Sequence, residues 1–296
     1  MRTERILRPN RRTMEGKANM SNDELLGQHP CFHNGNKNKG RMHLPVARPC
    51  NIKCAFCTPM VDACYHGCRP GVSAEILSPE EALKRVDWAV AADPTFLVVG
   101  IAGPGEPLLS EETFQTFELV KRKYPQLILC ASSNGLLLED NVERMKGLID
   151  TLTVTVNALT VPVAKKIYEH INGKTSNEAF QDFLDKQWRG IRLAIQEGIT
   201  VKINTVYVKN RNEDEIERIA IKASEYGATI HNILQVYRNN NILLSEVPTI
   251  GDMERMRYLC GRHLNQLLTC QRCRADVIQF GDGRQIRPCC SMNGIS

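Results

Sequence analysis

The chain has 296 residues, a net charge of +5 and 24% charged residues. This length suffices for one large domain with a substantial core, and no apolar run reaches the roughly 18 residues that a membrane-spanning helix needs. The basic first 22 residues lack the apolar segment of a signal peptide, so we expect a cytoplasmic protein without a membrane partner. In the reducing cytoplasm, twelve cysteines are better explained by metal sites than by disulfides.

Apolar, β-branched runs alternate with helical patterns along most of the chain. Strands are predicted at residues 42–47, 96–101, 127–132, 151–156, 200–208 and 229–236. Helices are predicted between them, beginning at the Ser78 cap and then over 110–123, 140–148, 179–196 and 212–226. Six β-α units imply an α/β fold with a parallel sheet, and a partial (β/α)6 barrel of the TIM type fits better than a closed eight-stranded one. Its active site is expected at the carboxyl ends of the strands.

Three parts are expected along the chain. Residues 1–27 form a basic, flexible arm, 28–240 form the barrel, and 241–296 form a C-terminal helix and a cysteine-bearing extension. The arm holds much of the mild positive charge and is typical of a solvated tail, so we expect no nucleic-acid partner.

Three cysteines follow the first predicted strand at C-x3-C-x2-C spacing: Cys50, Cys54 and Cys57. Three thiolates hold three irons of a cubic 4Fe–4S cluster and leave the fourth iron open to another ligand. A structural zinc or redox thiol cluster is the alternative, but zinc sites usually take four ligands from paired C-x2-C units. The motif therefore favours a cluster that reacts over one that only carries electrons.

This spacing resembles the signature of the radical S-adenosylmethionine (SAM) superfamily, in which the open iron binds the amino and carboxylate groups of SAM. Phe56, directly before the third cysteine, fits that resemblance, because the superfamily favours an aromatic residue there, near the adenine. The resemblance implies two cofactors: a 4Fe–4S cluster on Cys50, Cys54 and Cys57, and SAM.

Polar residues and glycines follow the next three predicted strands, where a barrel holds its ligands. Glycines let the backbone approach a ligand closely, and Glu106 would offer a carboxylate to the SAM ammonium. Asn134 and Asn157 suit the ribose and carboxylate of SAM, although either could equally be a satisfied turn residue. The predicted SAM-binding residues here are Gly103, Gly105, Glu106, Ser132, Asn134 and Asn157.

The remaining nine cysteines include a second C-x2-C pair, Cys270 and Cys273, after the last predicted helix. A buried cysteine acting as a small apolar side chain is the simplest explanation for Cys260 and partly for Cys130. That explanation suits the loop cysteines poorly, because thiols in polar loops are usually ligands or redox groups. These loop cysteines are Cys31, Cys64, Cys68, Cys270, Cys273, Cys289 and Cys290.

The chain is further similar to one radical SAM family, the nitrogenase cofactor maturase NifB, in order from about residue 28 to 278. The shared segments are HPC at 29–31, RMHL at 41–44, CNIKC at 50–54, RPGV at 69–72, GIAGPG at 100–105, LCASSNGL at 129–136, TVTVN at 153–157, VKIN at 201–204, HNI at 231–233 and CQRCRAD at 270–276. Several of these strings are peculiar to the family and are not general to radical SAM enzymes.

The NifB resemblance implies an enzyme that fuses two further 4Fe–4S clusters, adds sulfur, and inserts a carbide derived from SAM. One SAM would donate a methyl group, and a second would be cleaved to a radical that abstracts hydrogen from it. The product would be an eight-iron nitrogenase cofactor precursor. Implied partners are a low-potential electron donor, an iron–sulfur donor protein and a downstream cofactor carrier or scaffold.

The resemblance also implies which side chains hold the two substrate clusters. Cys31, Cys130 and one of Cys64 or Cys68 would hold one cluster, and the Cys270–Cys273 pair would hold the other. Few ligands per cluster leave irons open and let the product leave. His43 is our candidate for a labile nitrogen ligand, and a core histidine bonded to backbone is the alternative.

Two other classes of function stay open. One is a radical SAM enzyme that modifies a peptide or small organic substrate and holds an auxiliary iron–sulfur cluster. The other is a non-catalytic iron–sulfur carrier, which the predicted SAM pocket argues against. The sequence departs from the NifB pattern at two places: Gly67-Cys68 stand before Arg69, and Cys289 and Cys290 are adjacent. These departures bear on the identity of the product more than on the SAM chemistry.

Overall fold

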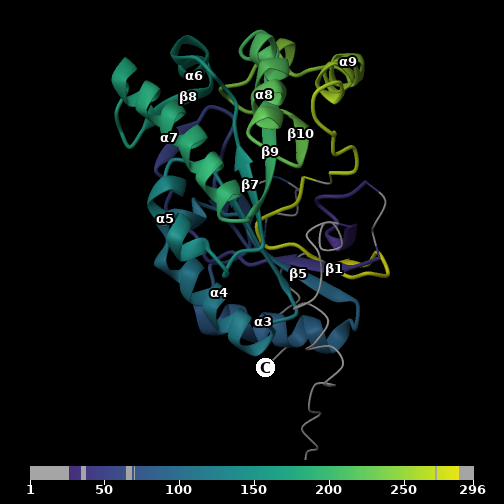
Figure 1. Cartoon of the computed structure of the whole chain (residues 1–296). Helices are drawn as coiled ribbons and strands as arrows, with labels where there is room; N and C mark the ends of the chain where they lie inside the picture. Colours follow the sequence, from purple (N-terminus) through teal and green to yellow (C-terminus); the bar gives the residue numbers. More distant parts are fainter. Residues whose placement is uncertain (1–26, 35–37, 65–68, 70, 271, 287–296) are drawn as a thin grey trace, which may run out of the picture.

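The computed structural model describes residues 27–34, 38–64, 69, 71–270 and 272–286. The predicted N-terminal arm up to residue 26 therefore lies outside the described residues, as do Cys68, Cys289 and Cys290. In Figure 1 a twisted sheet runs through the molecule, with helices along its outer side.

The sheet contains six parallel strands that are neighbours in chain order. They are β1 (Gly40–His43), β5 (Phe96–Ile101), β6 (Ile128–Ser133), β7 (Thr151–Thr155), β9 (Thr200–Tyr207) and β10 (Ile230–Gln235). The predicted α/β class with six parallel strands is confirmed. The first strand was expected at 42–47 and instead ends at His43, because Pro45 has no N–H with which to continue the ladder.

The helices follow the strands as predicted, with one addition, α6. Ser78 caps α3 through a full capping box, as its sequence indicates. The prediction at 140–148 was two residues late at its start and three at its end, since α5 begins at Leu138 and ends at Met145. The helices are α3 (Pro79–Ala92), α4 (Glu111–Lys123), α5 (Leu138–Met145), α6 (Val161–Ile167), α7 (Asn177–Gln196), α8 (Glu213–Glu225) and α9 (Ile250–Gly261), with 3-10 turns η1 (Pro107–Leu109) and η2 (Leu244–Glu246).

Two short strand pairs lie outside the main sheet, and the sequence predicted neither. β2 (Ile52–Cys54) runs antiparallel to β8 (Tyr168–Ile171), and β3 (Met60–Val61) runs parallel to β4 (Val72–Ser73). Strands of two to four residues are too short to show the alternation that identifies a strand. The β2–β8 pair matters most, because it fixes the backbone of Cys54.

The segment after α9 contacts both edges of the parallel sheet. Along β10, the N–H of His231 donates to Asn265 O at 2.8 Å, and the N–H of Leu267 donates to His231 O at 2.8 Å. Further on, β11 (Ile278–Gln279) pairs antiparallel with β1 and continues into β12 (Gln285–Ile286). In Figure 1 this yellow segment lies beside the purple β1. Cys270 and Cys273 are therefore carried across the opening between the two edge strands.

The core lies between the sheet and its helices. Alternate strand side chains such as Met42, Leu129 and Ile203 are fully buried there, against Phe114 and Phe117 of α4 and other helix residues. The side chains between them on each strand point to the opposite face of the sheet. Within the described residues, every helix is too short or too polar to cross a membrane.

Replacement of Gly190 by alanine is expected to lower the free energy of unfolding by about 1–3 kcal/mol. A Cβ at Gly190 in α7 would overlap Leu138 Cβ and lie 3.0 Å from Glu139 N of α5, so the two helices would have to separate. Urea denaturation measures the change. Gly251→Ala in α9 is the matched control, since a Cβ there would lie 3.9 Å from Thr249 Oγ1, an ordinary contact distance. Equal stability of the two variants would contradict close packing of α5 against α7.

Candidate metal and cofactor site

A cavity of ≈ 330 Å³ opens on the face of the sheet opposite the helices. The strands supply polar or sulfur side chains to it at every second position, as strand geometry requires. They are Arg41 and His43 on β1, Cys130 and Ser132 on β6, Thr153 and Thr155 on β7, Lys202 and Asn204 on β9, and Asn232 on β10.

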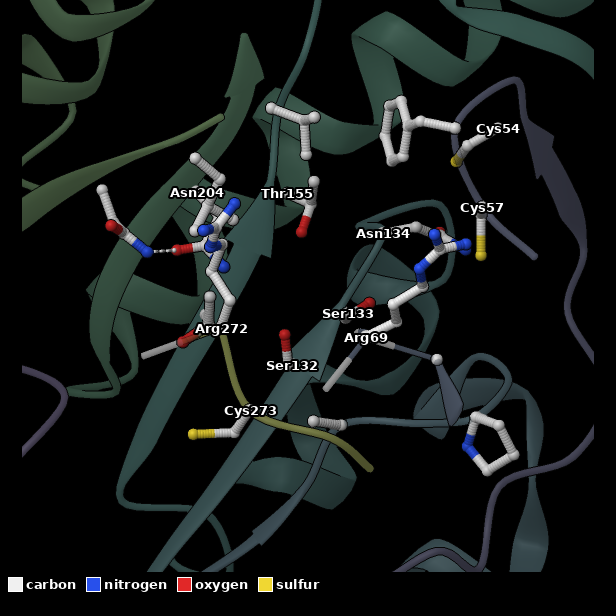
Figure 2. Close-up of a pocket in the computed structure, with 18 of the residues that line it drawn as sticks. Cys54, Cys57, Arg69, Ser132, Ser133, Asn134, Thr155, Asn204, Arg272 and Cys273 are labelled. Atoms are coloured by element: carbon white, nitrogen blue, oxygen red, sulfur yellow. Dashed lines mark hydrogen bonds between the residues drawn. The ribbon is translucent and has the colours of Figure 1, made fainter. Parts of the chain in front are cut away.

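The cavity collects most of the cysteines. Nine cysteines are described by the structure, and seven of them line the cavity: Cys31, Cys50, Cys54, Cys57, Cys130, Cys270 and Cys273. Figure 2 shows Cys54 and Cys57 toward one side and Cys273 toward the other, with Ser132 and Thr155 between them in this view. Thiols that are more than 200 residues apart in the sequence thus face one space.

Cys50, Cys54 and Cys57 face one another across one end of the cavity. Burial raises the pKa of all three thiols, and the neighbouring thiols raise the pKa of Cys54 and Cys57 further, to about 11 for Cys57. Thiols whose ionised form is disfavoured by burial suit a shared cationic iron core, which would compensate their charges. Among the described side chains, no group of three His, Cys, Asp or Glu is close enough to hold a single metal ion.

The glycine-rich loop after β5 is hydrogen-bonded to the loop that carries these cysteines. The N–H of Gly105 donates to Ala47 O at 2.7 Å, and the N–H of Glu106 donates to Pro49 O at 2.8 Å. A Cβ at Gly105 would overlap the carbonyl oxygens of Arg48 and Pro49, so only glycine allows this approach. Gly105 therefore positions Cys50 through the backbone that precedes it.

Glu106 is buried and bridges two strand ends. Its Oε1 accepts from Ser133 Oγ at 2.7 Å and from Leu108 N at 3.1 Å, and its Oε2 accepts from Asn134 N at 2.7 Å. Burial raises the pKa of Glu106, although these hydrogen bonds oppose the rise. The carboxylate lines the cavity, but most of its acceptor capacity is used inside the protein. A contact with a SAM ammonium stays a prediction.

The two predicted asparagines line the cavity and are also tied into the fold. Asn134 Nδ2 donates to Asn51 Oδ1 at 2.7 Å, which joins the end of β6 to the cysteine loop. Asn157 Oδ1 accepts from Val206 N at 2.8 Å, and its Nδ2 donates to the hydroxyl of Tyr168 at 3.1 Å. Both side chains thus have structural roles, and SAM binding by either stays a prediction.

Of the other predicted SAM-binding residues, Phe56 and Ser132 line the cavity, whereas Gly103 does not. Gly103 has φ +132°, a conformation that favours glycine, and it precedes Pro104 in the loop after β5. Its place in the structure is therefore a backbone role beside the cavity.

His43 presents one ring nitrogen to the cavity. Its Nδ1 lies 2.9 Å from the carbonyl oxygen of Arg274, which accepts only, so Nδ1 carries the hydrogen. Burial and the nearby Arg41 charge lower the pKa of His43, so the ring is neutral and Nε2 holds a lone pair. A Cβ at Gly100 would lie 3.0 Å from His43 Cδ2. The imidazole ring therefore has room here only because residue 100 is glycine. This contact fits both a nitrogen ligand fixed by a second hydrogen bond and a core histidine bonded to backbone, so metal binding by His43 stays a prediction.

Arg41 joins cysteines from the two ends of the chain, which the sequence did not predict. Its Nη1 donates to Cys31 Sγ at 2.5 Å, and its Nη2 donates to Cys273 Sγ at 3.1 Å. Burial alone would raise the pKa of Cys31, but Arg41 and other neighbours outweigh it and hold that pKa well below its usual value. The sequence offered one signal that Arg41 faces the cavity. Arg41 lies two positions before His43, which places both side chains on the same face of β1.

Two described cysteines lie outside the cavity. Cys64 is exposed on the loop after β3, where its N–H donates to Asp62 Oδ1 at 2.8 Å, so the structure does not bring it to Cys31 and Cys130. Cys260 is fully buried in α9 among apolar side chains, as its simplest explanation predicted.

Residues 44–223 match the family model of the radical SAM superfamily. The FeMo cofactor biosynthesis protein NifB of Methanocaldococcus infernus is 37% identical over 262 residues, which cover 86% of this chain and 86% of that protein. NifB of Chlorobaculum tepidum is 33% identical over 262 residues, or 86% of this chain, but the chain spans only 62% of that relative's length. The solved structure of Streptococcus suis SuiB bound to S-adenosylmethionine has a TM-score of 0.54 at 15% identity, covering 86% of this chain and 62% of that one, so it indicates a shared fold.

Replacement of Glu106 by glutamine is expected to weaken SAM binding and to lower stability by about 1–3 kcal/mol. Glutamine has one accepting oxygen where the carboxylate has two, so it cannot accept from Ser133, Leu108 and Asn134 together. The end of β6 must therefore shift. Isothermal titration with SAM and thermal denaturation measure the two effects. Glu112→Gln is the matched control, since this exposed carboxylate also accepts from a serine, Ser110, at 2.6 Å. Wild-type SAM affinity and stability in Glu106→Gln would contradict the bridging role.

Proposed function

Because this chain belongs to the NifB family of the radical SAM superfamily, we propose that it builds an eight-iron precursor of the nitrogenase cofactor. It is a radical SAM enzyme. In the proposed reaction the chain fuses two 4Fe–4S substrate clusters and inserts a carbide that comes from SAM. The relatives' printed role, FeMo cofactor biosynthesis, supports this reaction and not its individual steps.

The observation that carries the proposal is the gathering of seven thiols around one cavity. Cys50, Cys54 and Cys57 suit the resident 4Fe–4S cluster, which with SAM supplies methyl transfer and one-electron cleavage chemistry when bound. In the proposal, Cys31 with Cys130 and Cys270 with Cys273 would form two further sets. A protein that only carried electrons would have no need to direct three sets of thiols into one space.

The charge of the cavity supports an anionic cargo. Five cationic side chains line it, Arg41, Lys53, Arg69, Lys202 and Arg272, against one carboxylate, Glu106. Iron–sulfur clusters held by thiolates carry net negative charge, so such a lining favours their entry. The polar wall of β6, β7 and β9 would donate hydrogen bonds to sulfides or to the SAM ribose.

We assign the first substrate cluster to Cys31, Cys130 and the neutral Nε2 of His43. Two thiols and one imidazole leave an iron open, and imidazole is more easily displaced than a thiolate, so the cluster can react and leave. Cys64 would enter this set only if its loop moved toward the cavity, and Cys68 lies outside the described residues. The second substrate cluster belongs to Cys270 and Cys273.

The proposed partners follow from the same reaction. SAM cleavage requires a low-potential electron donor, and the substrate clusters require an iron–sulfur donor protein. The product then requires a carrier or scaffold that receives it from the cavity.

A radical SAM enzyme acting on a peptide or small organic molecule is the second candidate. The apolar side chains of Leu234, Val236 and Leu267 in the cavity wall favour it, because they would contact organic groups. Iron analysis separates the two candidates. About twelve irons per chain, as three 4Fe–4S clusters require, with cluster spectra that change on SAM addition would support cofactor assembly.

Replacement of Cys54 by alanine is expected to abolish reductive cleavage of SAM, because two thiolates cannot hold the cluster in reactive geometry. Chromatography of 5′-deoxyadenosine formed under dithionite measures the loss. Cys260→Ala controls for removal of a buried cysteine, since Cys260 lies in the core of α9. Full 5′-deoxyadenosine formation by Cys54→Ala would rule out the assignment of the resident cluster.

The double variant Cys270→Ala, Cys273→Ala is expected to lose roughly four irons per chain, one cluster's worth, and to release no multi-iron product. It should still cleave SAM, because the Cys50, Cys54 and Cys57 end is built from other strands. Iron analysis and anaerobic extraction measure both results, again beside Cys260→Ala. If the double variant modified an organic acceptor at the wild-type rate, the second candidate would replace the first.

A further inference from the structure

Arg41 contacts one cysteine from each of the two proposed substrate-cluster sites. It lies on β1 with 7% of its surface exposed, and its two Nη atoms reach different sulfurs, Cys31 at 2.5 Å and Cys273 at 3.1 Å. These cysteines are 242 positions apart and belong to different thiol sets. One guanidinium therefore touches a proposed ligand of each cluster.

The third guanidinium nitrogen of Arg41, Nε, fixes the direction in which the two Nη atoms, here called the fork, point. Arg41 Nε donates to Gln279 Oε1 at 3.0 Å, and Gln279 is the residue directly opposite Arg41 in the β1–β11 ladder. With Nε held by the neighbouring strand, the planar group keeps both Nη atoms aimed at the sulfurs. A lysine has a single ammonium and cannot reproduce this fork.

A second buried cation stands beside Arg41. Lys202 on β9 is 5% exposed, donates to the carbonyl oxygen of Cys31 at 3.2 Å, and lies 5.1 Å from the centroid of the Phe32 ring. Lys202 thus holds the Cys31 backbone from the β9 side, whereas only Arg41 contacts both sulfurs. The two cations have different tasks.

We propose that Arg41 is a positioning residue that holds the two substrate clusters side by side for fusion. This inference rests on the proposed function. Two thiolate-bound clusters are anions that repel each other, and a guanidinium that contacts a ligand sulfur of each offsets that repulsion. Hydrogen bonds from one rigid group to a ligand sulfur of each cluster also fix their separation. Arg41 takes no part in electron, methyl or proton transfer.

The test uses the full chain reconstituted anaerobically with iron and sulfide. Arg41→Lys keeps the charge and removes the fork, and Gln279→Ala keeps the guanidinium and removes its anchor. Arg257→Lys is the matched control, since Arg257 is a half-buried arginine in α9 that donates to a backbone carbonyl outside the cavity. Iron per chain, electron paramagnetic resonance of the reduced protein, and the yield of multi-iron product after SAM addition are measured for each, with circular dichroism to check folding.

Arg41→Lys is expected to keep its substrate-cluster iron but to lose the spin coupling between the two clusters. Its product yield should fall by roughly tenfold or more, as a misplacement of about 1 Å can cause. The spin coupling and product yield of Gln279→Ala should lie between those of Arg41→Lys and the wild type. Those of Arg257→Lys should match the wild type. The spectroscopic change is the readout that a merely structural role would not produce.

Three outcomes would overturn the inference. Wild-type coupling and yield in Arg41→Lys would remove the positioning role while leaving the proposed function intact. Loss of one whole cluster from a folded Arg41→Lys would instead make Arg41 necessary for loading and not for spacing. A wild-type chain that holds no second substrate cluster would refute the proposed function itself, and the inference would fall with it.

Discussion

An open parallel sheet has two edge strands whose backbone groups need partners, and this constraint organises the whole site. Here β1 and β10 are those edges, and one segment after α9 bonds to both of them. Because that segment must cross the gap between the edges, Cys270 and Cys273 reach the cavity on the face of the sheet opposite the helices. The same hydrogen bonds that complete the sheet thus bring the last thiols to the first ones.

The loops at the strand ends are joined to one another by buried polar groups. Glu106 joins the loop after β5 to the end of β6, and Asn134 joins that end to the cysteine loop through Asn51. Buried polar groups are costly unless they are bonded, so these contacts fix the loops more firmly than apolar packing would. Two of the residues predicted to bind SAM, Glu106 and Asn134, therefore also help to hold the cysteine loop in place.

Most of the regular elements followed from the sequence because their signals are local. The alternation of β-branched runs with capped helical patterns predicted six parallel strands and their helices, and Ser78 predicted its capping box. The short pairs β2–β8 and β3–β4 had no such signal, since each strand is stabilised by its partner and not by its own sequence. Pro45 is a strand breaker that the sequence displays, and the predicted strand at 42–47 wrongly included it.

The sequence by itself determined the chemistry of the protein: three cysteines at cluster spacing, a second cysteine pair, and glycines where backbones must touch. These features depend on residue type and spacing, which a sequence displays directly. Only the tertiary structure decided which thiols share a cavity, why Cys64 does not, and that Arg41 contacts both Cys31 and Cys273. Those contacts join residues that are far apart in the chain, and their geometry is set by strand pairing and burial, which no local pattern encodes.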